Sequence, residues 1–318
     1  MPSRAQITPL PDADSGHPGH LSLLVEPEQG IDPIYALIDG AKRSIALTMY
    51  ELVDTRAALA LEAAAGRGVD VRVILDASRQ RARNQSAYDE LSAMGVHVAW
   101  SDRRFAATHE KALVVDHAVV AVMSLNLTSR YYPTTRDFAI LDDAPSDVAA
   151  VEQVFAADFK HAKTVTPAGT ALVWSPRQSK PALLALIDAA KSTLLVENEE
   201  MAFQPVTAAL EKAARRGVQV TLVMTRQPRW DAALSKLTAA KVRVRTYAPT
   251  APLYIHAKAI VADAGSSRQR AFVGSENFSG ASLDQNRELG ILTSDPGIVA
   301  RLAETIGADA AGADQWQR

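Results

Sequence analysis

The sequence predicts an α/β protein made of two similar α/β sandwich lobes, each with a mixed central sheet flanked by helices. Two observations predict this fold. First, the chain repeats itself: residues 36–42 (ALIDGAK) match residues 185–191 (ALIDAAK), and residues 62–73 (EAAAGRGVDVRV) match residues 211–222 (EKAARRGVQVTL). This nearly constant offset indicates two copies of one structural unit. Second, strand patterns alternate with helix patterns inside each copy, as in α/β domains.

In the first copy, residues 44–50 (SIALTMY) form an apolar run that is typical of a buried strand. Residues 57–65 follow with a helical pattern that ends at a glycine, a residue suited to a helix C-cap. Residues 69–75 (VDVRVIL) alternate between apolar and polar and then turn apolar, as a strand beside a sheet core does. We expect a second helix next, then a short strand over residues 96–100.

The second copy keeps the same order. Residues 193–196 resemble a buried strand, and residues 206–215 resemble a helix that ends near Gly217. Residues 218–224 (VQVTLVM) repeat the alternating strand pattern, and residues 242–247 give the short strand. The expected organisation is a flexible N-terminal tail over 1–30, a first lobe over 31–162, a linker over 163–179, a second lobe over 180–306, and a C-terminal tail over 307–318.

Composition places the chain among soluble globular proteins, and it excludes several site types. The 318 residues are 47% hydrophobic with a net charge of −2 and no cysteine. Disulfides, thiolate nucleophiles and Cys-ligated zinc are therefore excluded. No run approaches the roughly 18 apolar residues of a membrane span. We expect a soluble monomer; the N-terminal region lacks the apolar core of a signal peptide, and a secreted or periplasmic location through a removed leader stays open.

Both copies carry the same short pattern, His-x-Lys-x4-Asp. It is formed by His109, Lys111 and Asp116 in the first copy and by His256, Lys258 and Asp263 in the second. Residues i and i+2 of a strand point to the same face, so the imidazole and the ammonium group project together. The aspartate falls where the strand turns, and aspartate favours turns. We therefore interpret Asp116 and Asp263 as structural residues.

Each pattern is followed by a Ser-x-Asn pair on the returning strand: Ser124 and Asn126, then Ser275 and Asn277. Spacing of two again places serine and asparagine on one face, so we expect both to contact a substrate.

An acid also recurs at one position in each copy. Asp137 lies 13 residues after Ser124, and Glu288 lies 13 residues after Ser275. A carboxylate that accepts the Nδ1–H of each histidine would fix the tautomer and leave Nε2 free. We expect Asp137 and Glu288 to orient the two histidines.

Two imidazoles, two ammonium groups and two carboxamides suit phosphodiester cleavage through a covalent phosphohistidine. One neutral histidine attacks phosphorus, and the other donates a proton to the leaving oxygen. The lysines and asparagines hold the non-bridging oxygens and stabilise the transition state. This chemistry needs one active site shared by both lobes and no cofactor. We expect no metal there, because the adjacent lysines would repel a cation.

At these residues the sequence resembles the phospholipase D superfamily, whose defining element is a duplicated His-x-Lys-x4-Asp followed by a Gly/Ser–Asn segment. The resemblance covers nearly all of residues 31–306. It implies two similar α/β units around one site and metal-independent phosphodiester hydrolysis or transfer through a phosphohistidine. The residues that match the family pattern are His109, Lys111, Asn126, His256, Lys258 and Asn277. In many two-lobed members the N-terminal histidine is the nucleophile, which implies His109 as nucleophile and His256 as acid.

For the substrate, we expect a phospholipid at a membrane surface, cleaved at the headgroup ester or transferred to an alcohol. The slightly acidic net charge favours lipid, because proteins that bind nucleic acid are usually basic. A metal-independent endonuclease acting on DNA or RNA is the alternative. A third hypothesis is a catalytically inert lipid- or nucleic-acid-binding protein, against which the six intact residues of the pattern argue.

Several other residues leave two interpretations open. Arginines that follow two corresponding strands either bind a second anionic group or are ordinary solvated charges: Arg79, Arg81, Arg83, Arg226 and Arg229. Aromatic residues near the motifs either cradle a choline or a base, or belong to the core: Trp100, Phe105, Tyr131, Tyr132, Tyr247 and Tyr254. Glu199 and Glu200 either enter the site or are buried against lysine. The remaining histidines are interpreted as surface or packing residues: His17, His20, His97, His117 and His161.

Overall fold

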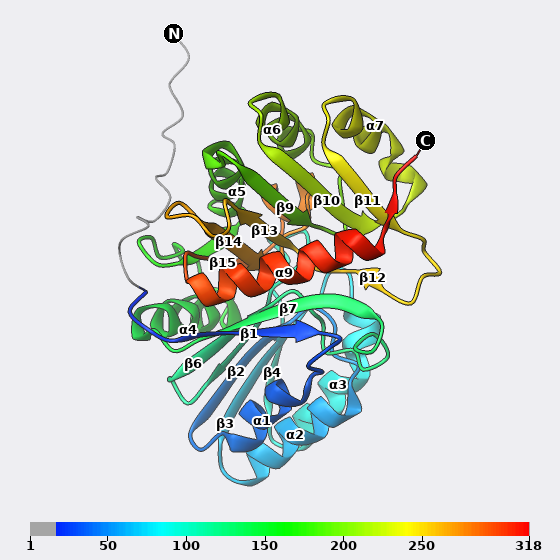
Figure 1. Ribbon diagram of the computed structural model, residues 1–318. Helices are drawn as coiled ribbons and strands as arrows, with labels where there is room; N and C mark the ends of the chain where they lie inside the picture. Colours follow the sequence, from blue (N-terminus) through cyan, green and yellow to red (C-terminus); the bar gives the residue numbers. More distant parts are fainter. Residues whose placement is uncertain (1–16, 318) are drawn as a thin grey trace.

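The computed structural model describes residues 17–317 and shows two α/β lobes that face each other (Figure 1). The strands of the first lobe are β1 (Leu21–Glu26), β2 (Ser44–Met49), β3 (Asp70–Leu75), β4 (His97–Trp100), β5 (Lys111–Val115), β6 (Val119–Met123) and β7 (Thr135–Asp142). Those of the second are β8 (Leu172–Ser175), β9 (Thr193–Glu197), β10 (Gln219–Thr225), β11 (Arg243–Tyr247), β12 (Tyr254–Ile255), β13 (Ala259–Ala262), β14 (Arg270–Gly274), β15 (Glu288–Thr293) and β16 (Asp314–Gln315).

The two sheets have the same topology, which confirms the predicted fold class and repeat. The first sheet runs β1-β7-β6-β5-β2-β3-β4, and the second runs β8-β15-β14-β13-β9-β10-β11-β16. In each, three parallel strands adjoin an antiparallel group, so both sheets are mixed. Strand β12 departs from this symmetry, because it leaves its own lobe and pairs with β7 of the first.

Helices cover both sheets on both faces (Figure 1). The helices are α1 (Asp32–Gly40), α2 (Thr55–Gly66), α3 (Arg81–Ala93), α4 (Pro145–Phe159), α5 (Ser179–Ala189), α6 (Gln204–Arg215), η1 (Pro228–Trp230), α7 (Asp231–Ala239), α8 (Gly280–Asp284) and α9 (Pro296–Gly312). One core lies between α1–α3 and the first sheet, and a second lies between α5–α7 and the second sheet. A third core joins the lobes, with α4 and α9 packed between the inner faces of the two sheets.

Three of the predicted segment boundaries are wrong in the described range. Residues 21–26 of the expected tail over 1–30 form β1, which pairs with β7 and buries Leu24 and Val25; residues 1–16 lie outside the described residues. The expected linker over 163–179 contains β8, which pairs with β15. The expected tail over 307–318 contains the last turns of α9 and β16. Each segment is ordered because it adds a strand to a sheet edge or covers the core between the lobes.

The two motif aspartates are structural, as predicted. Asp116 has a positive φ of 57°, and its carboxylate accepts backbone N–H groups of Lys42, Arg43 and Ser44. Asp263, with φ 52°, does the same for the corresponding loop of the second lobe. Each carboxylate therefore fastens the turn after the motif strand to the loop that precedes the neighbouring antiparallel strand, β2 or β9.

Two buried arginines hold the lobes together in a symmetrical way. Arg136 of β7 pairs with Asp309 of α9 (Nε–Oδ2 2.6 Å), and Arg287, just before β15, pairs with Asp158 of α4 (Nη2–Oδ1 3.0 Å). Each pair joins a strand of one lobe to a helix that follows the other lobe's sheet. Only 3% of Arg136 and 5% of Asp309 are exposed, so neither charge can be satisfied by solvent.

No helix within residues 17–317 is long and apolar enough to cross a membrane.

Replacing Arg136 with methionine is expected to destabilise the protein strongly. The change leaves Asp309 buried beside the lobe junction without its partner, and breaking a buried pair costs about 3–5 kcal/mol. Urea unfolding measures the loss. Arg72→Ala is the control, because Arg72 pairs with Asp70 on the surface and its loss costs at most about 1 kcal/mol. An Arg136→Met variant as stable as Arg72→Ala would show that the buried pair does not hold the lobes together.

Candidate active site

The two motif histidines come from opposite lobes and line one cavity. Its volume is about 990 Å³, and its walls contain residues of both lobes. His109 lies two residues before the start of β5, and His256 directly follows β12. The sequence predicted that both repeats build a single site, and the structure brings the two imidazoles to the same cavity.

The chain segment before each histidine crosses to the other lobe. Thr108 forms a parallel bridge with Arg287, and the N–H of His109 donates to the carbonyl of Arg287 (2.9 Å). In the same way, Tyr254 pairs with Thr135, and the N–H of His256 donates to the carbonyl of Arg136 (3.2 Å). The backbone of each histidine is thereby bound to the residue that directly precedes the acid of the other lobe.

Each histidine consequently pairs with the acid of the opposite lobe. His109 Nδ1 lies 2.8 Å from Glu288 Oε2, and His256 Nδ1 lies 2.8 Å from Asp137 Oδ1. An N–H at Nδ1 donating to the carboxylate leaves Nε2 as the free ring nitrogen. The geometry thus agrees with the orienting role predicted for Asp137 and Glu288, and it adds that the partners are exchanged between lobes.

The prediction that the two serines contact substrate is wrong. Ser124 and Ser275 are fully buried, and neither lines the cavity. Ser124 Oγ donates to Asp137 Oδ1 (2.6 Å), and Ser275 Oγ donates to Glu288 Oε2 (2.7 Å). Each hydroxyl lies between neighbouring antiparallel strands, where it holds the acid that orients a histidine.

The carboxylate of Glu288 has more hydrogen-bond partners than that of Asp137. Glu288 Oε1 accepts the Ser282 hydroxyl of α8 (2.7 Å) and the Asn286 side-chain amide (3.0 Å). Thr135, the counterpart of Asn286, donates instead to the carbonyl of Tyr131 (2.8 Å). Burial raises the pKa of Glu288, but His109 outweighs it and the net pKa is lowered. Sequence reasoning did not identify Ser282, because the helix that carries it, α8, has no equivalent between β6 and β7 of the first repeat.

Both motif lysines are fully buried next to their histidines. Lys111 Nζ donates to the carbonyl of His109 (2.6 Å), and Lys258 Nζ donates to that of His256. Burial, reinforced by the second ammonium group of Lys258, lowers the pKa of Lys111 to about 7. An ammonium group has three donors, so each lysine keeps capacity for an anionic ligand after this bond.

The motif asparagines line the cavity and are incompletely bonded. Among the described residues, the Oδ1 atoms of Asn126 and Asn277 are buried without a hydrogen-bond partner. The Asn277 side-chain amide reaches Glu199 only at 3.5 Å. Because buried amide oxygens are normally paired, each of these oxygens can accept a hydrogen bond from a ligand in the cavity.

The surroundings of His109 favour its neutral form. Burial lowers the pKa of His109; the carboxylate of Glu288 opposes this, and the charge of Lys111 adds to it. The ring of Tyr50 packs edge-on against it, with the centroids 4.5 Å apart. A neutral imidazole whose Nδ1 is held by a carboxylate presents the lone pair of Nε2, which is the form a nucleophile needs.

The second histidine faces an extra acid. Glu199 Oε2 lies 3.7 Å from His256 Nε2 and 3.5 Å from Lys258 Nζ. Burial raises the pKa of Glu199, but His256 and Lys258 outweigh it and lower the pKa to about 2. Both open interpretations of Glu199 therefore hold, since it lines the cavity and also contacts lysine. In the aligned position of the first repeat, Tyr50 stands where Glu199 stands in the second.

The other candidate residues divide between the cavity and the surface. Of the five arginines, Arg79 lines the cavity, whereas the guanidinium of Arg81 lies over Trp100 and Arg83 pairs with Glu51. Arg226 and Arg229 do not line it. The aromatic residues in the wall are Tyr131, Tyr132 and Tyr254, and those outside it are Trp100, Phe105 and Tyr247. Glu200 also lines the cavity.

Comparisons with known proteins agree with the two-lobed fold. A family model described as "Cardiolipin synthase, PLD-like domain" matches residues 34–159 and 183–309. The structure of a polyphosphate kinase from Porphyromonas gingivalis aligns with a TM-score of 0.73 at 16% identity, covering 90% of this chain and 46% of the kinase. That of a phosphatidylserine synthase from Haemophilus influenzae Rd KW20 aligns with a TM-score of 0.71 at 12% identity, covering 93% of this chain and 87% of the synthase.

No sequence among the curated proteins matches the chain. The chain spans less than half the length of the polyphosphate kinase, and at these identities the two structural likenesses concern the fold alone.

Replacing Glu199 with glutamine is expected to tighten anion binding. The carboxylate lies beside Lys258 and His256, where an anion would meet it as a like charge. Removing one charge within several ångströms of a ligand at a protein surface strengthens binding by roughly tenfold. Calorimetric titration with inorganic phosphate measures the change, with Glu211→Gln, a half-buried position on α6 outside this cavity, as the control. Unchanged or weaker phosphate binding by Glu199→Gln would mean that this carboxylate does not compete with the anion.

Proposed function

Because the chain belongs to the phospholipase D superfamily, we propose that it is a metal-independent phosphodiesterase that hydrolyses phospholipids at the headgroup ester or transfers the phosphatidyl group to an alcohol. The observation that carries this proposal is the reciprocal pairing of His109 with Glu288 and of His256 with Asp137 around one cavity. Two oriented imidazoles from opposite walls suit a reaction that needs a nucleophile on one side of phosphorus and an acid on the other.

In the proposed first step, His109 Nε2 attacks phosphorus and the bond from phosphorus to the headgroup oxygen breaks. His256 donates the proton of its Nε2 to that oxygen, so the headgroup leaves as a neutral alcohol. A phosphatidyl group then remains covalently attached to His109. In the second step, His256 takes a proton from water, the water oxygen attacks phosphorus, and the bond to His109 breaks. An alcohol in place of water gives transfer.

Differences between the two histidines support this assignment of roles. Burial lowers the pKa of His109, and its neighbour Tyr50 is uncharged, so the neutral nucleophile is favoured there. For His256, carboxylates face both nitrogens: Asp137 at Nδ1 and Glu199 near Nε2. Carboxylate charge thus lies near both ring nitrogens of His256, which suits a group that donates a proton and takes one back.

The lysines and asparagines are assigned to the phosphate oxygens. Lys111 and Lys258 supply positive charge from a buried, water-poor environment, where electrostatic interactions are stronger than in water. Asn126 and Asn277 line the cavity, and the NH2 groups of their carboxamides are the donors assigned to these oxygens. Preorganised donors of this kind stabilise the extra negative charge of a five-coordinate transition state, and loss of one typically costs about 10²–10³-fold in rate.

Charges on the cavity wall favour a lipid over a nucleic acid. Apart from the two motif lysines, Arg79 is the sole arginine or lysine at this cavity among the described residues, whereas Glu51, Asp137, Glu199 and Glu200 contribute carboxylates. A nucleic acid carries a phosphate on each nucleotide, and its binding sites provide a positively charged groove along the backbone. This wall instead suits a substrate with one phosphodiester flanked by apolar or cationic groups. Nuclease activity is the alternative that the following experiment tests.

Choline release from phosphatidylcholine vesicles with EDTA present tests the proposal. The wild type is expected to release choline, and His109→Ala and His256→Ala are each expected to lower the rate by about 10²-fold or more, because each step needs both groups. His97→Ala, an exposed position on β4, is the control. Most activity surviving in either single variant would contradict a shared site, and cleavage of plasmid DNA without choline release would assign the nuclease instead.

The pH dependence of kcat/KM is expected to be bell-shaped. Activity rises as His109 loses its proton, at a pH below the ordinary 6.5 because its pKa is lowered. Activity then falls as Lys111 loses its proton, around the pKa of about 7, because a neutral amine no longer holds the phosphate. Bound phosphate stabilises the ammonium form, so the alkaline limb of kcat is expected at higher pH than that of kcat/KM. A flat profile between pH 5 and 9 would contradict these roles.

A further inference from the structure

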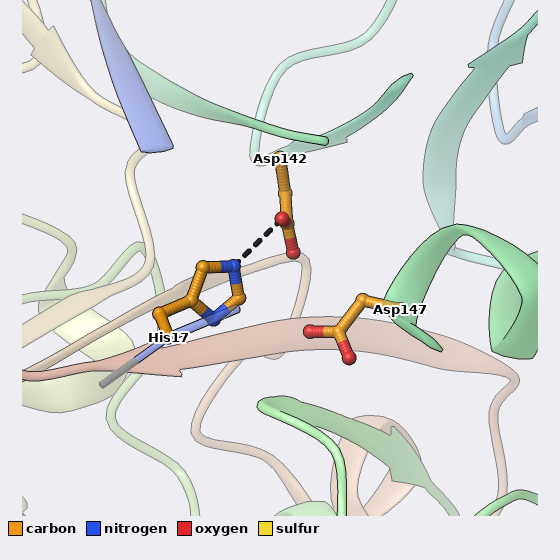
Figure 2. Close-up of side chains that lie close together, drawn as sticks. All are labelled: His17, Asp142 and Asp147. Atoms are coloured by element: carbon orange, nitrogen blue, oxygen red, sulfur yellow. Dashed lines mark hydrogen bonds and ion pairs between the residues drawn. The ribbon is translucent and has the colours of Figure 1, made fainter. Parts of the chain in front are cut away.

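A second group of potential ligands lies outside the candidate active site. His17 precedes β1, Asp142 is the last residue of β7, and Asp147 is in the first turn of α4. One ligand atom from each of the three lies within 4.8 Å of the other two. In Figure 2 the carboxylate of Asp147 points toward the imidazole of His17, which contacts Asp142 through Nε2 (2.7 Å to Oδ1). None of the three lines the active-site cavity.

The two carboxylates are buried and incompletely satisfied. Asp142 is 0% exposed and Asp147 is 2% exposed. Within the described part of the chain, the Oδ2 atom of each is buried without a hydrogen-bond partner. The remaining bonds are modest: the Ala144 N–H donates to Asp142 Oδ1 (2.8 Å), and the Ser146 hydroxyl donates to Asp147 Oδ1 (3.2 Å). Two buried carboxylates that share one imidazole are therefore short of positive charge and of donors.

The mutual repulsion of these carboxylates shows in their acidity. Burial, together with the charge of Asp142, raises the pKa of Asp147 to about 6. Among the residues that the structure describes, His17 is the basic side chain grouped with this pair, and it contacts Asp142 alone through a hydrogen bond. A cation bound between the three side chains would remove the repulsion and occupy both unpartnered oxygens.

We propose that His17, Asp142 and Asp147 form a binding site for a divalent transition-metal cation of the zinc class. One imidazole nitrogen and two carboxylate oxygens are a ligand set that Zn²⁺ accepts, with water completing a four-coordinate site. Ca²⁺ and Mg²⁺ prefer oxygen ligands alone, so the imidazole selects against them. The site therefore gives His17 a role other than the surface or packing role interpreted from the sequence.

The position of this site points to a structural function. Asp142 ends the strand that carries Asp137 near its start, so the cation lies at the other end of β7 from the proposed chemistry. The cation would join the segment before β1 to the end of β7 and to the start of α4. The cation takes no part in the proposed phosphodiester reaction, which needs no metal.

Calorimetric titration of the untagged, EDTA-stripped protein with ZnCl₂ tests the proposal. The wild type is expected to bind one Zn²⁺ per chain at this site and to bind Ca²⁺ and Mg²⁺ far more weakly. Asp147→Asn and His17→Ala are each expected to weaken Zn²⁺ binding by more than about tenfold, since even outer-shell partners of a metal ligand are worth 10–100-fold in affinity. The matched control is His117→Ala, because His117 pairs with Glu152 of the same lobe without a second acid.

Thermal unfolding gives a second measurement that does not depend on the variants. Zn²⁺ at a hundred times its Kd is expected to raise the Tm of the wild type by about 5 °C, because the cation binds the folded chain alone. Absence of saturable Zn²⁺ binding by the wild type would overturn the proposal. Binding that persists in Asp147→Asn but is lost in His256→Ala would overturn it too, since the cation would then lie in the active-site cavity.

Discussion

The exchange of strands between the lobes is the constraint on which the rest of the site depends. The segments that lead into His109 and His256 each pair with the opposite lobe at the start of a strand, β15 or β7, where an arginine is followed directly by an acid. The backbone carbonyl of that arginine fixes the histidine main chain, and the acid one residue later fixes the imidazole. The arginine side chain, in turn, pairs with a buried aspartate across the lobe junction. Two neighbouring residues on each strand thus join the lobes and orient the histidines, so lobe packing and site geometry cannot vary independently.

Buried charge is the second consequence of this arrangement. Two ammonium groups, Lys111 and Lys258, are fully enclosed, and the acids that surround the motifs compensate them. Such an array is costly to desolvate unless each charge is paired. The carboxylate of Glu199 meets part of that need in the ligand-free site, where it lies beside Lys258 and His256. A bound phosphate would take over the same positive charge, and we therefore regard Glu199 as a resident anion that the substrate replaces.

The sequence was sufficient for what depends on local pattern and on repetition. The constant offset predicted two lobes, period-two spacing placed histidine beside lysine, and the turn preference of aspartate explained Asp116 and Asp263. Contacts between the lobes could not be derived in this way, because alternation gives the face of a strand but not the strand that faces it. Ser124 and Ser275 were misassigned for that reason: their face was right, but the neighbouring strand buries them against Asp137 and Glu288. Strand β1 was missed because it lies ahead of the segments whose repetition defined the units.

Trapping the covalent intermediate is the measurement that tests the central claim most directly. The wild type would be mixed with a short-chain phosphatidylcholine, quenched within the turnover time in alkaline denaturant, and digested for peptide mass spectrometry. The account predicts a phosphatidyl adduct on the peptide that contains His109 and none on the peptide that contains His256. An adduct on His256 would reverse the two roles. Turnover without any histidine adduct, under conditions that preserve phosphohistidine, would contradict the covalent mechanism itself.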